Sequence, residues 1–173
     1  MSNYLQNVSN RFETYKLLAE RAFDQLSESD IQWQYNKESN SIAITVKHIV
    51  GNMLSRFTNF LNEDGEKSWR QRDTEFENPY TSKVEMLEAW ELGLKCVFSA
   101  LEPLTEEMLE QTVVIRNEKH TIIEALNRQL AHYAYHIGQI VYIGRMLKGN
   151  DWKSLSIPKG RSEEFNKNYT PKH

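Results

Sequence analysis

The positions of the four prolines constrain the fold of this chain more than any other feature of its sequence. Proline removes a backbone hydrogen-bond donor and clashes with the preceding helical turn, so long helices form where it is absent. The four prolines leave three long proline-free stretches, because they lie at Pro79, Pro103, Pro158 and Pro171. The chain is therefore expected to build its core from long helices.

Apolar side chains recur at steps of three and four residues in four segments, the spacing that turns one face of a helix towards a core. These segments are residues 4–26, 42–61, 83–101 and 122–148. Capping-box patterns begin the last two, at Ser82 and Thr121, and Gly149 ends the fourth. Four amphipathic helices of this length predict an all-α fold, a four-helix bundle.

The connections at 62–81 and 102–120 are longer than simple helical hairpins need. Long connections permit crossovers, so neighbouring helices need not all be antiparallel. The best strand candidate is the short segment 112–115, just ahead of the last helix. Residues 152–173 contain several apolar side chains and are expected to pack as a C-terminal tail.

Length and composition predict one domain that spans residues 1–173. The first residues lack the basic and apolar regions of a secretory signal, and no apolar run is long enough to cross a membrane. The single cysteine, Cys96, excludes an internal disulfide and fits a reducing compartment, so a cytoplasmic location is expected. A net charge of −3 creates no field that attracts nucleic acid or anionic lipid, so neither is expected as a partner.

Two histidines, His132 and His136, lie four residues apart in the last predicted helix. Their rings project from one helix face and can reach one metal ion. His48 in the second predicted helix is a candidate third ligand, whereas His120 and His173 are weaker candidates. Imidazole is a common ligand of zinc, nickel, copper and iron, so these three histidines predict a divalent-metal site.

Spacing and composition leave a second interpretation open, in which the histidines have structural or surface roles. Other metal sites lack their motifs here. No histidine follows a glutamate by three residues as in di-iron bundles, and the chain contains neither a His-Glu-x-x-His nor a Cys-x-x-Cys sequence. Nucleophile-elbow, phosphate-loop and dinucleotide-binding motifs are also absent from the sequence.

The segment from Thr121 to Gln139 resembles the signature helix of the DinB-like superfamily of metal-binding bundles. That superfamily includes bacillithiol S-transferases and mycothiol-dependent maleylpyruvate isomerases. Its pattern is one histidine on the second helix and two on the fourth, followed by Gly-Gln. The matching residues here are His48, His132, His136, Gly138 and Gln139. The resemblance covers the whole chain, and the linker around Trp69 and the tail around Pro158 resemble an uncharacterised subfamily.

The resemblance implies helices that run up, down, down and up, with a metal ion held by the three histidines at one end of the bundle. Zinc or nickel is the expected ion, and three imidazoles leave positions open for a substrate. The implied activity is that of a metal-dependent enzyme, such as a low-molecular-weight-thiol S-transferase acting on a small molecule. The alternative is a non-catalytic metal-binding or stress-response interaction module. The resemblance also implies a homodimer.

Two polar residues near the histidines are candidates for supporting the site. Gln139 lies one turn beyond His136 and is expected either to orient a water molecule or a ligand imidazole, or to serve helix contacts. Asn52 has the same two interpretations beside His48. A glycine inside a helix needs a reason, so Gly51 and Gly138 are expected to permit close helix approach.

Arginines outside the predicted helices are candidates for binding an anionic substrate. Arg70 and Arg72 lie in the second connection, and Lys159 and Arg161 lie in the tail. Arginine binds carboxylates in a fork geometry, although most surface arginines are simply solvated. Three large apolar residues are candidates for either the core or a dimer interface, namely Trp90, Phe98 and Trp152.

Overall fold

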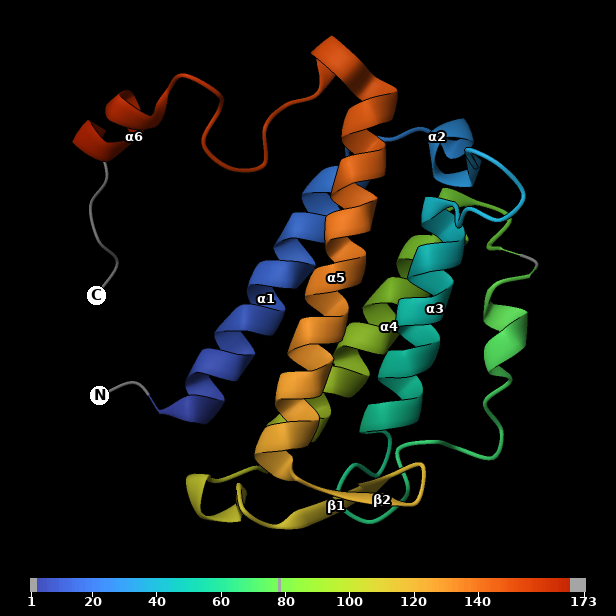
Figure 1. The fold of residues 1–173 in the computed structure, drawn as a ribbon, viewed down its shortest axis with the longest axis vertical. Helices are drawn as coiled ribbons and strands as arrows, with labels where there is room; N and C mark the ends of the chain where they lie inside the picture. Colours follow the sequence, from blue (N-terminus) through green and yellow to red (C-terminus); the bar gives the residue numbers. More distant parts are fainter. Residues whose placement is uncertain (1–2, 78, 169–173) are drawn as a thin grey trace.

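A computed structural model describes residues 3–77 and 79–168 of the chain, which are mostly helical. The four long helices are α1 (Tyr4–Phe23), α3 (Ile42–Phe57), α4 (Lys83–Leu101) and α5 (Ile122–Lys148). In Figure 1, α1 and α5 point in one direction, and α3 and α4 point in the other. α1 packs on α5, and α3 packs on both α4 and α5. None of the helices within these described residues combines the length and the apolar character that a membrane span needs.

The third and fourth predicted helices have the limits that the sequence predicted. The first two end a few residues earlier than predicted, and the reason is clearest for α3. Thr58 has an extended backbone with ψ 123°, and Asn59 has a φ of 49°, so the chain leaves the helical conformation directly after Phe57. Apolar periodicity continues past this point, but the backbone has already turned.

A two-stranded antiparallel sheet lies at the lower end of the molecule in Figure 1, so the fold is not purely helical. β1 (Thr112–Ile115) is the predicted strand, and its partner β2 (Glu118–Thr121) was not predicted. Arg116 and Asn117 form the turn, with φ values of 56° and 63°. Both oxygens of the Asp64 carboxylate accept backbone N–H bonds from these turn residues at 2.8 Å. The connection after α3 is therefore tied to the hairpin.

Short helical segments occupy parts of the connections and the tail. They are α2 (Glu28–Gln32), η1 (Arg72–Glu75), η2 (Glu106–Met108), η3 (Gly149–Asp151) and α6 (Ser162–Asn168). The 3₁₀ turn η1 is the one that matters for function, because it packs along α3. The long connection 62–81 therefore lies against α3, the helix that carries His48.

Aromatic side chains join the helices in the core. Phe12 of α1 contacts both Phe57 of α3 and Tyr133 of α5, with ring centroids 6.1 and 5.7 Å apart. Trp90 of α4 is only 2% exposed and meets Phe23 edge-on. Its side chain therefore belongs to the core, and its candidacy for a dimer interface is wrong.

Among its described residues, the predicted C-terminal tail packs through Trp152 and Leu155, which corrects part of the expectation of a packed tail, and residues 169–173 lie outside the described residues. Trp152 is half-buried and would lie 3.2 Å from a Cβ atom at Gly144, so its ring rests on α5. Arg21 donates a hydrogen bond to the carbonyl oxygen of Leu155. Beyond this point the described residues are exposed, Ile157 among them, and Figure 1 shows α6 set apart from the long helices.

Candidate metal centre

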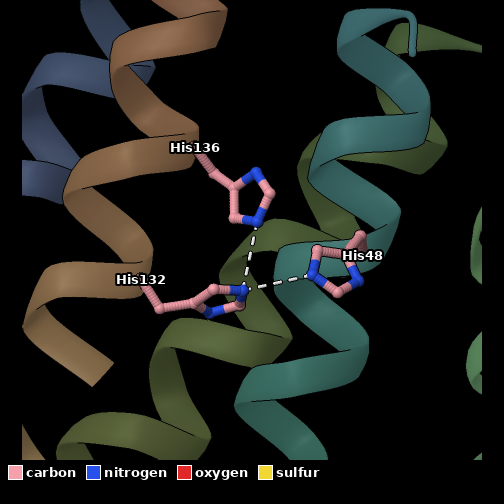
Figure 2. A group of neighbouring side chains, drawn as sticks. All are labelled: His48, His132 and His136. Atoms are coloured by element: carbon pink, nitrogen blue, oxygen red, sulfur yellow. Dashed lines mark hydrogen bonds between the residues drawn. The ribbon is translucent and has the colours of Figure 1, made fainter. Parts of the chain in front are cut away.

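Three histidine side chains meet between α3 and α5. His48 comes from the middle of α3, and His132 and His136 lie one turn apart on α5, so all three rings point into the space between the helices (Figure 2). The Nε2 atom of His132 lies 3.2 Å from that of His48 and 3.1 Å from that of His136. The three ligand atoms lie within 4.8 Å of one another. The structure thus brings together the histidines that the sequence proposed.

Two of the three rings are held in position through Nδ1. His48 Nδ1 lies 2.8 Å from Glu75 Oε2, and His136 Nδ1 lies 2.9 Å from Gln139 Oε1. An ionised carboxylate and an amide oxygen can only accept, so each Nδ1 carries the proton. The Nε2 atoms of His48 and His136 therefore present lone pairs towards the centre, as metal-ligating histidines do.

His132 tests whether this arrangement fits a cation. If His132 carries its proton on Nε2, it can donate that proton to the Nε2 of only one neighbouring histidine, His48 or His136. The Nε2 lone pair of the other histidine then faces no donor. A proton on His132 Nδ1 instead meets no partner among the described residues, because that atom is buried without a hydrogen bond. A divalent ion that accepts all three Nε2 lone pairs resolves the conflict at the centre. The donor set therefore fits such an ion.

The electrostatic environment keeps the rings of His132 and His136 neutral, as metal ligation requires. Burial, followed by repulsion from His136 and His48, lowers the pKa of His132 to about 3. Burial also lowers the pKa of His136, although the hydrogen bond to Gln139 opposes this shift. Both rings therefore offer lone pairs at neutral pH without first having to lose a proton.

Glu75 belongs to an ion pair that sequence reasoning did not foresee. Arg70 donates to both of its carboxylate oxygens, from Nε at 2.8 Å and from Nη2 at 3.0 Å. Burial alone would raise the pKa of Glu75, but hydrogen bonds from His48 and Arg70 outweigh it and lower that pKa. Arg70, a candidate for binding an anionic substrate, has a buried side chain that fixes the carboxylate behind His48.

Two further features shape the space around His48. A Cβ atom at Gly51 would lie 2.2 Å from Glu75 Oε1, so only glycine leaves room for this carboxylate against α3. The ring of Phe76, the residue after η1, packs on the His48 ring, with their centroids 4.8 Å apart. A Cβ atom at Gly138 would meet no atom of another described segment within 4 Å, so the prediction that Gly138 permits close helix approach is wrong.

The remaining candidates have different surroundings. Asn52 accepts a hydrogen bond from the hydroxyl of buried Tyr133 at 3.2 Å. Arg72 is half-exposed, with its guanidinium 5.1 Å from the centre of the Phe76 ring. Arg161 lies in the exposed tail, where it pairs with Glu164, and Lys159 lies two residues earlier. Neither tail residue lines the cavity beside the histidines.

A cavity of about 280 Å³ opens beside the histidines. His48 and His132 form one side of it, Asn52 and Gln129 contribute amide groups, and five arginines complete its lining. Three of these arginines, which sequence reasoning missed, are Arg56, Arg116 and Arg128. They come from α3, the hairpin turn and α5, so no spacing along the chain indicated that they meet.

The fold and the site define a mostly helical protein with a candidate three-histidine metal centre. Residues 1–161 match the model of a family described as protein of unknown function (DUF1572), and the chain belongs to that family. No curated protein and no solved structure matches the chain. The family description assigns no activity, so the function must be inferred from the site.

Proposed function

We propose that this chain is a DinB-like protein that binds one divalent ion, zinc or nickel, through the Nε2 atoms of His48, His132 and His136. The observation that carries the proposal is the convergence of three imidazole nitrogens within 4.8 Å. The acceptors on the Nδ1 atoms of His48 and His136 support it, because ligating histidines commonly donate their second ring N–H. The opposed directions of the α1–α5 and α3–α4 pairs support the up-down-down-up bundle of that superfamily.

We further propose that the centre is catalytic and that the chain is a metal-dependent S-transferase for a low-molecular-weight thiol. Three protein ligands are the set that catalytic zinc sites use, whereas structural sites use four. The cavity beside His48 and His132 supports this choice, because it gives a small molecule access to two of the three ligands. When bound, the ion would act as a Lewis acid that makes a thiol more nucleophilic at neutral pH.

The chain's own residues would position the reactants. Glu75 holds the His48 ring and Gln139 holds the His136 ring, so the ligand nitrogens keep their direction during turnover. In the transfer, the thiol sulfur forms a bond to an electrophilic carbon whose leaving group departs with its electron pair, and the S–H proton is released to solvent. Phe76 covers one face of the His48 ring and limits the access of water there.

Metal content tests the binding proposal. We expect about one zinc or nickel ion per wild-type chain by elemental analysis, and loss of that ion in His132→Ala. His120→Ala is the matched control, because His120 lies in β2 outside the three-histidine group. The proposal fails if neither native nor added metal binds the wild type, or if His120→Ala loses as much metal as His132→Ala.

Turnover tests the catalytic proposal on the metal-loaded protein. The assay follows loss of free thiol from bacillithiol, glutathione or cysteine with an alkyl halide as the electrophile. We expect turnover in the wild type and in His120→Ala, and a loss of at least a hundredfold in His48→Ala. Stoichiometric metal without any thiol transfer would overturn the enzyme proposal in favour of a non-catalytic metal-binding module.

A further inference from the structure

We propose that the arginine-lined cavity beside the histidines binds a small polyanion through its carboxylate or phosphate groups. The five arginines are Arg56, Arg70, Arg72, Arg116 and Arg128. The inference extends the proposed function, because an anion held there would place its reacting end against the histidine centre. The anion site itself depends on the arginines alone.

Positive charge dominates the cavity wall. Among the described residues that line it, none is acidic. Two carboxylates hold three of the arginines: Glu66 Oε2 accepts from Arg56 at 3.0 Å and from Arg116 at 2.9 Å, and Glu75 holds Arg70. Together with the exposed Asp73, which lies 3.8 Å from Arg72, these carboxylates carry fewer charges than the five arginines. The surplus favours an anionic occupant.

Two buried guanidinium groups each have a nitrogen donor without an acceptor among the described residues. The Arg56 and Arg70 side chains are only 4% and 2% exposed. Arg56 Nε and Arg70 Nη1 have no hydrogen-bond partner among the described residues, and the nearest carboxylate oxygen to Arg70 Nη1 is Glu66 Oε1 at 3.7 Å. A buried charged donor without an acceptor is costly, so a ligand oxygen is the natural partner.

The rim of the cavity supplies more accessible charge. Arg128 is exposed and makes no hydrogen bond or ion pair with the described residues, and Arg72 is half-exposed. Arg116 sits in the hairpin turn at a φ of 56°, a conformation in which asparagine or glycine is usual. The two Asp64 bonds hold that turn in place, which keeps the Arg116 side chain directed at Glu66 beside the cavity.

The size and chemistry of the cavity define the ligand class. Its volume of about 280 Å³ suits a small molecule with a few anionic groups rather than a polymer. Planar guanidinium groups bind carboxylate and phosphate oxygens in pairs, so both anion types share the required chemistry.

Calorimetric titration of the metal-free full-length chain tests the proposal, with inorganic phosphate and with malonate as separate probes at low ionic strength. We expect one saturable site for at least one probe, and the tighter probe identifies the group that the site prefers. Arg128→Gln and Arg72→Gln are each expected to weaken binding about tenfold, the loss of one charge-assisted hydrogen bond. Arg145→Gln removes the same charge from an exposed position of α5 outside the cavity, and it should leave affinity unchanged.

The proposal is overturned if neither probe binds, or if Arg145→Gln weakens binding as much as Arg128→Gln does. Metal content measured on the same preparations separates this inference from the proposed function. Zinc binding without anion binding would contradict the proposed anion site and leave the proposed metal centre supported. Anion binding in a chain that never takes up metal would contradict the metal centre and leave the anion site supported.

Discussion

Glu75 connects the histidine centre to the arginine-lined cavity. One of its carboxylate oxygens accepts from His48 Nδ1, and both oxygens accept from Arg70. The carboxylate therefore orients a candidate metal ligand on one side and a cavity-lining arginine on the other. Removing its charge should affect both.

We expect Glu75→Gln to weaken zinc binding by about ten- to a hundredfold, the usual cost of altering a residue that orients a ligating histidine. Competition with a chromophoric chelator measures the zinc affinity. Glu88→Gln on the exposed face of α4 is the control and should bind zinc like the wild type. Equal affinities of Glu75→Gln and wild type would show that the carboxylate has no role in orienting His48.

The two helical glycines near the site form a matched pair with opposite expected outcomes. Gly51→Ala forces a Cβ atom into the Glu75 carboxylate, so zinc affinity should fall even though alanine favours helix. The new Cβ atom of Gly138→Ala meets no atom of another described segment within 4 Å, so the substitution should raise the free energy of unfolding by about 0.5–1 kcal/mol, with zinc affinity unchanged. Urea unfolding and chelator competition measure both quantities. A stabilised Gly51→Ala with normal zinc affinity would contradict the role assigned to Gly51.

Among the elements, the β1–β2 hairpin has its turn held by one distant side chain. Asp64 accepts the backbone N–H groups of Arg116 and Asn117, and both turn residues have positive φ. Gly65 donates its N–H to the carbonyl oxygen of Val114 at 2.8 Å. The connection after α3 thereby fixes the hairpin that delivers Arg116 to the cavity.

The Asp64 interaction should make stability depend on pH. Burial alone would raise the pKa of this carboxyl group, but backbone hydrogen bonds from Glu66, Asn117 and Arg116 outweigh it and lower that pKa in the folded chain. The stabilisation is therefore fully present above the ordinary value of 3.8 and is lost as the pH falls through the lowered folded value. We expect Asp64→Ala to cost about 1–3 kcal/mol at pH 7 and clearly less at pH 3. Urea unfolding at both pH values measures the difference, and an equal cost at both would contradict the prediction.

The helix limits show which elements local sequence can predict. α5 begins at a reciprocal capping box of Thr121 and Glu124 and ends at Gly149, whose φ is 53°, and all of these signals lie within the segment itself. At α4, Ser82 caps the helix as predicted and its hydroxyl accepts from the Glu85 N–H, but the Glu85 carboxylate accepts from the N–H of Thr81 instead of that of Ser82. β2 was missed because its four residues have little strand character until β1 pairs with them.

At the scale of the whole molecule, the proposed ion would join helices that are distant in the chain. His48 and His132 are 84 residues apart and lie on α3 and α5. Because an unfolded chain does not hold the three histidines together, metal binding should stabilise the folded state. We expect zinc at a hundred times its dissociation constant to add about 2.7 kcal/mol to the free energy of unfolding.

Urea unfolding with and without zinc measures this stabilisation. His132→Ala should gain none of it, and His120→Ala should gain as much as the wild type. A gain that persists in His132→Ala would place the stabilising ion elsewhere in the molecule.

Local patterns along the chain were enough to predict the four long helices, strand β1 and the pair of His132 and His136, because helical periodicity, caps and i,i+4 spacing operate within one segment. His48 was a candidate third ligand whose role the family resemblance implied. The support around the site depended on tertiary contacts. Glu75 is one of 24 acidic residues, and only the folding of η1 against α3 selects it as the partner of His48. The arginine cavity likewise exists because α3, α5, the hairpin and the long connection converge, and no local pattern in the sequence encodes contacts between segments so far apart.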